Sequence, residues 1–177
     1  MITFVDTPLP GLCVLQSAKA EDSRGYFTRL YSQQDFSTQK IDFTPRQNSL
    51  SHNTVAGTLR GMHFLRGAAA EYKLVTCLKG KIHDVAVDLR KDSSTYKKWF
   101  CVELSPENGL SLLIPKGFAH GFITLVDDSD VLYQIDGMYD ATAASGLRWN
   151  DPAIGIKWPR EPVVIADRDK EWAAYAG

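Results

Sequence analysis

Residues 73–89 read KLVTCLKGKIHDVAVDL, two short runs of apolar and β-branched residues on either side of Lys79-Gly80. Runs of this length between turn residues are typical of β-strands, and the Lys-Gly pair predicts a tight turn. Pro106-Glu107-Asn108-Gly109 predicts another turn, because Asn and Gly tolerate left-handed backbone angles. Working outward in the same way, we expect strands at residues 13–18, 26–31, 58–65, 73–78, 81–89, 98–104, 111–114, 121–125, 131–135 and 146–149.

Only two short helices are expected in this chain. Residues 32–39 favour a helix for which Ser32 supplies the N-cap, and residues 171–175 favour another near the C-terminal end. Many short strands with few helices indicate a mainly β protein, a β-sandwich or β-barrel. A length of 177 residues indicates a single domain that covers residues 1–177.

Composition limits the classes of function. The formal net charge is −1, so no overall charge attracts nucleic acid or a membrane, and an anionic ligand has to be bound by local cations. The start, Met1-Ile2-Thr3-Phe4, resembles no signal peptide, and no stretch approaches the roughly 20 apolar residues of a membrane span. We therefore expect a cytoplasmic protein. Cys13, Cys77 and Cys101 include no CxxC pair and are expected to be buried free thiols.

Five side chains that can bind or move charge lie within or beside the expected strands. Arg60 and His63 lie in GTLRGMHF at residues 57–64, and Lys73 begins the run quoted above. His120 lies in IPKGFAHGF at residues 114–122, and Tyr133 lies in DVLYQI at residues 130–135. A guanidinium, two imidazoles, an ammonium and a phenol are thus distributed through strand-like sequence.

Together with WNDP at residues 149–152, this set resembles the dTDP-4-dehydrorhamnose 3,5-epimerase family of cupins, from about Asp22 to Asp169. The resemblance implies a cupin jelly roll and usually a homodimer, in which an N-terminal arm exchanged between subunits would cover sheet edges. It also implies a cofactor-independent epimerase acting on a nucleotide-diphosphate 4-keto-6-deoxyhexose. The reaction would invert C3, C5 or both, as in the conversion of dTDP-4-dehydro-6-deoxyglucose to dTDP-4-dehydrorhamnose.

His63 corresponds to the catalytic base of that family, although by spacing alone it could be a core histidine. Imidazole takes up a proton near neutral pH, which suits a general base. Strict alternation along a strand would place Arg60 and His63 on opposite faces, and a bulge at Gly61 would bring both to one pocket. The family pairs its base with a C-terminal aspartate, which we assign to Asp169, with Asp167 as the rival.

Lys73 and Tyr133 complete the catalytic set that the resemblance implies. Lys73 shares a strand face with Val75 and Cys77, and a buried ammonium without a partner is costly. Its burial would be explained if it stabilised a developing enolate; otherwise it is an edge lysine in water. Tyr133 corresponds to the acid that returns a proton on the face opposite His63, although a tyrosine in a strand often serves only packing.

The resemblance also implies residues that bind the substrate. Arg24 lies in the nucleotide-binding arm, Arg24-Gly25-Tyr26-Phe27, and would bind the sugar and diphosphate with Arg60 and His120, since arginine can bind phosphate oxygens in bidentate fashion. Tyr139 corresponds to the aromatic residue that stacks on the base. The implied substrate-binding set is Arg24, Phe27, Arg29, Gln47, Asn48, Arg60, His120, Tyr139 and Arg168.

The chain departs from the family at the nucleotide arm. Arg29 stands where a glutamate is usual, and Met138 and Ala144 replace a frequent aromatic residue and a frequent glutamate. A carboxylate can accept a hydrogen bond from thymine N3–H, which a guanidinium cannot do, whereas cytosine offers acceptors that arginine satisfies. Arg29 could equally point to solvent. A CDP-linked epimerase therefore remains an alternative. Two further alternatives are a 3,4-ketoisomerase or single-site epimerase on the same fold, where Tyr133 argues against the ketoisomerase, and a non-catalytic sugar-nucleotide-binding cupin, against which the catalytic set argues.

No metal and no cofactor are expected from the motifs. A metal-binding cupin usually shows two histidines one residue apart, and Met62-His63-Phe64-Leu65 lacks the second. Too few ligands gather for zinc or iron, which argues against a metal cupin oxygenase. The sequence contains no GxGxxG or P-loop motif either, so no redox cofactor is implied.

Overall fold

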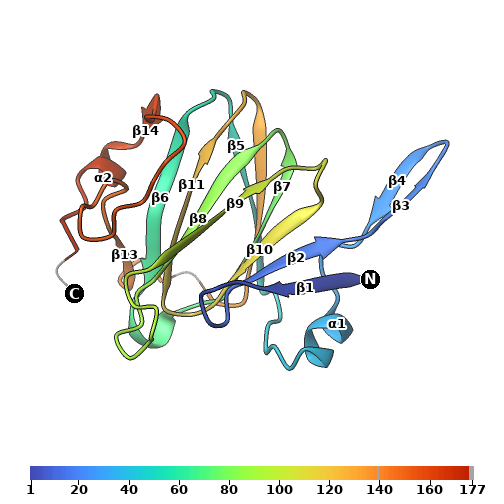
Figure 1. Cartoon of the computed structure of the whole chain (residues 1–177), viewed down its shortest axis with the longest axis horizontal. Helices are drawn as coiled ribbons and strands as arrows, with labels where there is room; N and C mark the ends of the chain where they lie inside the picture. The colour runs from blue at the N-terminus through green and yellow to red at the C-terminus, as the bar shows by residue number, and fades with distance from the viewer. Residues whose placement is uncertain (139, 176–177) are drawn as a thin grey trace.

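The computed structural model describes residues 1–138 and 140–175, and two antiparallel sheets packed face to face dominate it (Figure 1). The first sheet has the order β1 (Ile2–Asp6), β2 (Cys13–Ser17), β10 (Leu110–Ile114), β7 (Lys73–Lys79), β12 (Ser129–Ile135) and β5 (Gln47–Asn53). The second has the order β13 (Ala144–Gly146), β6 (Thr58–Leu65), β11 (Phe118–Thr124), β8 (Ile82–Asp88) and β9 (Trp99–Leu104), and β14 (Val164–Ile165) runs parallel to β6. The mainly β, cupin-like class is thereby confirmed.

Most expected strands are present, and the sequence explains one of the omissions. β5 was missed because its sequence, QNSLSHN, is polar and most of its side chains are exposed at the sheet edge. β1 and β3 (Lys19–Asp22) were also missed, although β1 has an ordinary strand sequence. β11 starts at Phe118 rather than at residue 121, and the strand expected at 146–149 is β13, which ends at Gly146. The Lys79-Gly80 turn joins strands of different sheets rather than a hairpin.

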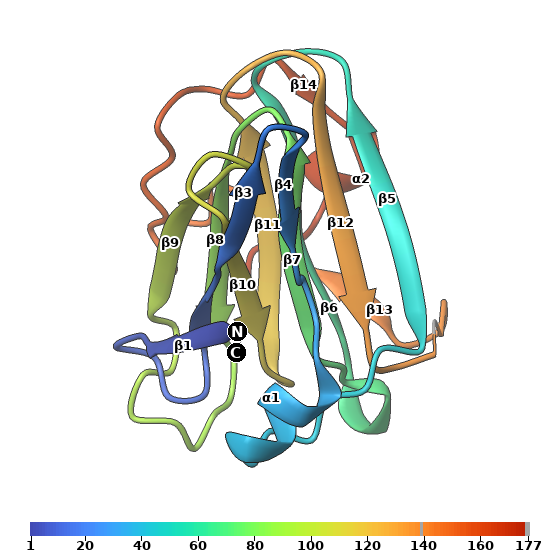
Figure 2. The same ribbon diagram turned by 90° about the vertical axis from the view of Figure 1, so that its right-hand side faces the viewer.

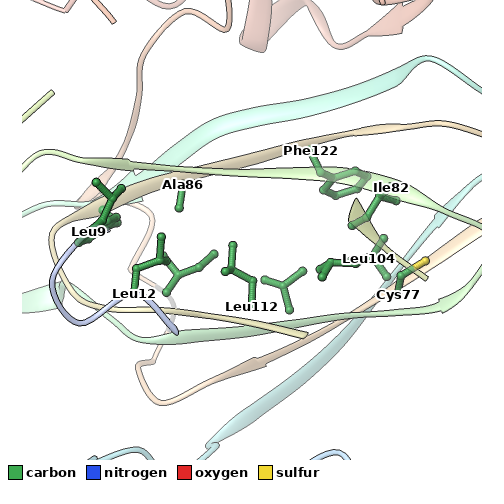
Figure 3. Close-up of a cluster of buried hydrophobic side chains, with 12 residues drawn as sticks. Leu9, Leu12, Cys77, Ile82, Ala86, Leu104, Leu112 and Phe122 are labelled. Atoms are coloured by element: carbon green, nitrogen blue, oxygen red, sulfur yellow. The ribbon is translucent and has the colours of Figure 1, made fainter. Parts of the chain in front are cut away.

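The main core fills the space between the two sheets. In Figure 3, Ala86 and Phe122 of the second sheet face Leu112 of the first, while Leu9 and Leu12 close one end. Each large apolar side chain buried in this way contributes about 1.5–3 kcal/mol to folding. Cys77 belongs to this core, Cys13 is also buried, and Cys101 is half-buried; all three are free thiols.

A second core lies on the outer face of the first sheet, under α1 (Gln33–Thr38). Ser32 caps α1 as expected, since its side chain accepts a hydrogen bond from the Asp35 N–H at 3.3 Å. The helix buries Phe36 against Phe43, with ring centroids 5.2 Å apart, and against Leu74 of β7. A short 3₁₀ helix, η1 (Gly67–Ala69), follows β6.

The C-terminal segment covers the outer face of the second sheet. Leu147, Ile154 and Ile156 pack there with Met62 and Val85. The segment then returns to β6 through β14 and α2 (Asp167–Lys170), both visible at the red end of the chain in Figure 1. The helix expected at 171–175 is wrong, because the acidic residues of the first turn place the helix start at Asp167 instead.

β3 and β4 (Gly25–Thr28) form a hairpin that projects away from both sheets, as the two views show (Figures 1 and 2). Phe27, at 72% exposure, and Tyr26, at 51%, are among the most exposed large apolar side chains of the described residues. Within residues 1–138 and 140–175, no helix has the length and apolar character needed to cross a membrane.

Candidate active site

A cavity of about 650 Å³ opens between the β5–β12 side of the first sheet and the β6–β13 side of the second. Strands from both sheets line it, together with the C-terminal segment around α2. The expected site residues that it brings together are Arg60, His63, Lys73, His120, Tyr133, Arg168 and Asp169.

A bulge in β6 places Arg60 and His63 in the same cavity. His63 pairs with His120 of β11 and Arg60 with Phe122, so three residue steps of β6 oppose two steps of β11. Gly61 makes this possible: its φ is +138°, and a Cβ there would lie 2.5 Å from the Cα of Gly121. Only glycine fits such close contact of two strands, and the bulge expected at Gly61 is confirmed.

Asp169, rather than Asp167, lies against the His63 ring. Its Oδ1 is 2.6 Å from His63 Nε2, and its Oδ2 accepts the Gly61 N–H at 3.1 Å. A carboxylate can only accept, so in the neutral ring Nε2 carries the proton and Nδ1 has a free lone pair for a ligand. Burial alone would raise the pKa of Asp169, but the hydrogen bonds and charge of His63 and the Gly61 N–H outweigh it and lower that pKa. Asp167 is exposed and pairs with Lys170 at 2.9 Å.

Lys73 enters the cavity from the first residue of β7 and is nearly buried. Its Nζ lies 3.5 Å from Oε1 of Glu71, a carboxylate that also lines the cavity. Burial lowers the pKa of Lys73, and the negative charge of Glu71 opposes that shift only in part. For Glu71, burial raises the pKa and the charge of Lys73 opposes it. The ammonium is therefore held in a site where its charge is costly.

Tyr133 faces the cavity from β12, in the sheet opposite the one that carries His63. Its ring packs edge-on against His120, with centroids 5.7 Å apart, and His120 Nε2 lies 2.7 Å from Oδ1 of the buried Asp84. Although part of the Tyr133 side chain is accessible, burial, followed by the charge of Asp84, raises its pKa well above the usual value, with Arg60 acting in the opposite direction. Tyr133 thus keeps its proton at neutral pH.

The guanidinium of Arg60 is fixed by β5. Its Nε donates to Asn53 Oδ1 at 2.7 Å, and Nη2 donates to the His52 carbonyl at 3.3 Å. Arg168, which also lines the cavity, lies over the Trp172 ring at 5.2 Å. Two guanidinium groups in the cavity lining suit the binding of an anionic group.

Other expected binding residues lie outside this cavity. Gln47 donates to the Gly137 carbonyl at 2.6 Å, and Asn48 is exposed. Arg24 pairs with Asp22 at 2.6 Å on the projecting hairpin, where Phe27 is also exposed, and Arg29 is exposed directly after it. Tyr139 lies outside the described residues.

Three site residues were not predicted from the sequence: Asp84, Glu71 and Asn53. A signal for Asp84 was present, because it shares a face of β8 with the core residues Ile82 and Ala86. A carboxylate at a core-facing position needs a partner, and this one is His120. In the described part of the chain, no three His, Cys, Asp or Glu side chains converge as metal ligands would.

Comparisons with known proteins agree on one family. Residues 6–176 match a family model described as dTDP-4-dehydrorhamnose 3,5-epimerase. A dTDP-4-dehydrorhamnose 3,5-epimerase of Salmonella typhimurium is 42% identical over 90% of this chain and 87% of that protein. Among solved structures, the dTDP-4-dehydrorhamnose 3,5-epimerase of Bacillus anthracis, with TDP and PPi bound, superposes with a TM-score of 0.96 at 38% identity, covering 99% of this chain and 100% of that one. The dTDP-6-deoxy-D-glucose-3,5-epimerase of Legionella pneumophila, in complex with dTDP-4-keto-L-rhamnose, gives 0.90 at 32% identity, with coverage of 96% and 90%.

Proposed function

The chain belongs to the dTDP-4-dehydrorhamnose 3,5-epimerase family, and we propose that its cavity inverts C3 and C5 of dTDP-4-dehydro-6-deoxyglucose with His63 as base and Tyr133 as acid. The chain is an isomerase. The observation that carries the assignment of roles is the placement of two proton-handling groups on facing sheets, His63 on β6 and Tyr133 on β12, both lining one cavity. Inversion at carbon requires proton removal and return on opposite faces.

Proton removal falls to His63. The 4-ketone acidifies the C–H bonds at C3 and C5, and Nδ1 of His63 offers the free lone pair. Asp169 holds the ring through Nε2 at 2.6 Å and stabilises the imidazolium that forms. A negative charge then develops on the ketone oxygen, so the ketone itself is the electron sink.

Lys73 and His120 stabilise this enolate, and Tyr133 completes the inversion. A cation placed in advance near a developing oxyanion lowers the barrier because it needs no reorganisation. Tyr133 keeps its proton until the carbanion can accept it, since burial raises its pKa. Both His63 and Tyr133 then return to their starting states by exchange with water, so solvent hydrogen enters the product at each inverted centre.

We propose that the nucleotide is thymidine diphosphate and that it is bound by two copies of the chain. The Bacillus anthracis and Legionella pneumophila structures contain TDP and a dTDP-sugar, which supports thymidine over the cytidine alternative. Arg24 and Phe27 lie on the projecting hairpin (Figure 1) or its turn and Arg29 directly follows it, and none of the three lines the cavity of its own chain. An exchanged hairpin in a homodimer would bring them to the partner cavity, where Arg60 binds phosphate.

The activity is tested with dTDP-4-dehydro-6-deoxyglucose in heavy water, followed by proton NMR of H3 and H5. We expect deuterium at both positions and a product of inverted configuration. A binding protein would leave both signals intact, and a 3,4-ketoisomerase would move the ketone from C4 to C3. Either of these results contradicts the proposed function.

The exchanged hairpin is tested by mixing two inactive variants. Arg24→Ala damages the hairpin and His63→Ala damages the cavity. If hairpins are exchanged, a mixed dimer has one site with both parts intact, and equal co-expression restores about a quarter of wild-type activity by random pairing. If each hairpin serves its own chain, mixing restores nothing, and light scattering of the wild type as a monomer would also refute the proposal.

A further inference from the structure

Glu71 is a second carboxylate in the cavity, and the reaction described above gives it no task. It lies just before β7, and its side chain is 8% exposed while that of Lys73 is 13% exposed. The two groups are 3.5 Å apart from Nζ to Oε1. Burying two opposite charges side by side costs their hydration, and only a close attraction between them offsets that loss.

The backbone beside Glu71 is tied to the segment that follows β12, and the Glu71 side chain lies against Gly137 of that segment. The next residue, Tyr72, donates its N–H to Asp136 Oδ1 at 2.7 Å, and the Asp136 N–H returns a bond to the Tyr72 carbonyl at 3.3 Å. Gly137 follows, and a Cβ there would lie 2.8 Å from Oε2 of Glu71. The chain thus leaves room at Gly137 for this carboxylate and ties the segment beside it to the end of β12.

The surroundings of Lys73 leave its ammonium dependent on this partner. Its neighbours across the sheet are Ile114 of β10 and Ile135 of β12, which offer no opposite charge. A buried ammonium with apolar neighbours loses its proton readily. Glu71 is the charge that opposes this loss.

We propose that Glu71 is a positioning residue that keeps Lys73 as an ammonium in the cavity and directs it toward the enolate oxygen. The inference rests on the proposed function, because Lys73 needs a positive charge only if an oxyanion forms beside it. Glu71 itself touches no reacting atom, and it acts through Lys73.

Other ionisable groups face this part of the cavity, and they do not replace Glu71. Asp136, after β12, is paired with Lys116 at 3.6 Å, and its charge acts on Glu71, whose pKa burial and Asp136 both raise. The remaining charged or titratable groups that line the cavity are Arg60 and His63 on β6, His120 on β11, Tyr133 on β12, and Arg168 and Asp169 on α2.

The Lys73–Glu71 pair determines in which direction the pKa of Lys73 changes when Glu71 is replaced. Glu71 raises the pKa of Lys73, while burial lowers it. Replacing Glu71 by Gln removes the raising contribution, so Lys73 deprotonates at lower pH. An opposite charge at this range typically moves a pKa by about 1–3 units. The alkaline limb of the pH profile should therefore move downward by about 1–3 pH units, with activity recovered at pH values below the new limb.

The first experiment compares pH profiles of deuterium exchange for the wild type, Glu71→Gln and Glu71→Asp. The Asp variant keeps the charge and should keep the limb near its wild-type position. Glu103→Gln is the matched control, because Glu103 pairs with Lys81 at 3.0 Å on the surface and away from the cavity. A folded Glu71→Gln variant whose profile superposes on that of the wild type overturns the inference.

A second experiment needs no turnover. Carbon-13 NMR of labelled lysine side chains gives the titration midpoint of Lys73, whose Cε signal is assigned by its loss in Lys73→Arg. The midpoint should be lower in Glu71→Gln than in the wild type, and equal midpoints overturn the inference. If the midpoint is lower in Glu71→Gln but the wild type gives no deuterium exchange, the inference about Glu71 stands and the proposed function is contradicted. The two failures are therefore distinguishable.

Discussion

Replacing Asp169 by Asn should impair the base without emptying the space it fills. The carboxylate uses two acceptor oxygens for two donors, His63 Nε2–H at 2.6 Å and the Gly61 N–H at 3.1 Å. An amide has one acceptor oxygen, so its NH₂ group must face one of these donors. The variant loses a charged hydrogen bond of about 1.5–3 kcal/mol, and proton removal should slow by about 10- to 150-fold.

The assay is the rate of deuterium incorporation at H3 and H5, measured at saturating substrate with circular dichroism to verify folding. Asp167→Asn is the control, because Asp167 lies two residues earlier, is exposed and pairs only with Lys170. We expect that control to stay within about twofold of the wild type, as surface pairs contribute little. An Asp169→Asn rate within twofold of the wild type, or an equal loss in Asp167→Asn, would refute the reasoning.

Two further substitutions test the acid and the nucleotide. Tyr133→Phe should keep part of the deuterium exchange driven by His63, while formation of the inverted product falls by about 10²–10⁴-fold, the usual contribution of a general acid. An equal loss of exchange and inversion would contradict the role of Tyr133 as the acid. The proposed thymidine nucleotide requires dTDP to bind more tightly than CDP in calorimetric titration. If Arg29 reads the base instead, CDP should bind more tightly, and Arg29→Glu should reverse the order by about tenfold to over a hundredfold. Tighter binding of dTDP by the wild type would mean that Arg29 does not read the base.

The sequence predicts most of the sheets because their strands bury alternate apolar residues. Val85 and Val87 pack under the C-terminal segment while Ala86 faces the inner core, so both faces of β8 are apolar and its assignment is secure. β5 fails the same test because an edge strand needs few buried side chains. The local sequence does not determine which strands pair with each other either. The sequence therefore could not show that the Lys79-Gly80 turn connects strands of different sheets.

Some site residues could likewise be predicted from the local strand pattern, whereas others depend on the tertiary structure. A bulge at Gly61 could be predicted, because alternation alone cannot bring Arg60 and His63 together. The choice between Asp167 and Asp169 depends on which one faces inward from a four-residue helix, and a short motif does not determine that. Glu71 was not predicted because it precedes its strand, where the period of two residues no longer fixes a side chain's direction.

The C-terminal segment has a consequence for how the enzyme loses activity. The carboxylate that orients the base is carried by a short helix at the end of the C-terminal segment, which packs on the outer face of the second sheet through Leu147, Ile154 and Ile156, while the main core lies between the two sheets. A segment with few buried contacts opens at a lower free-energy cost than the whole molecule. We therefore expect warming to detach this segment and abolish catalysis at a lower temperature than the one at which the two sheets unfold.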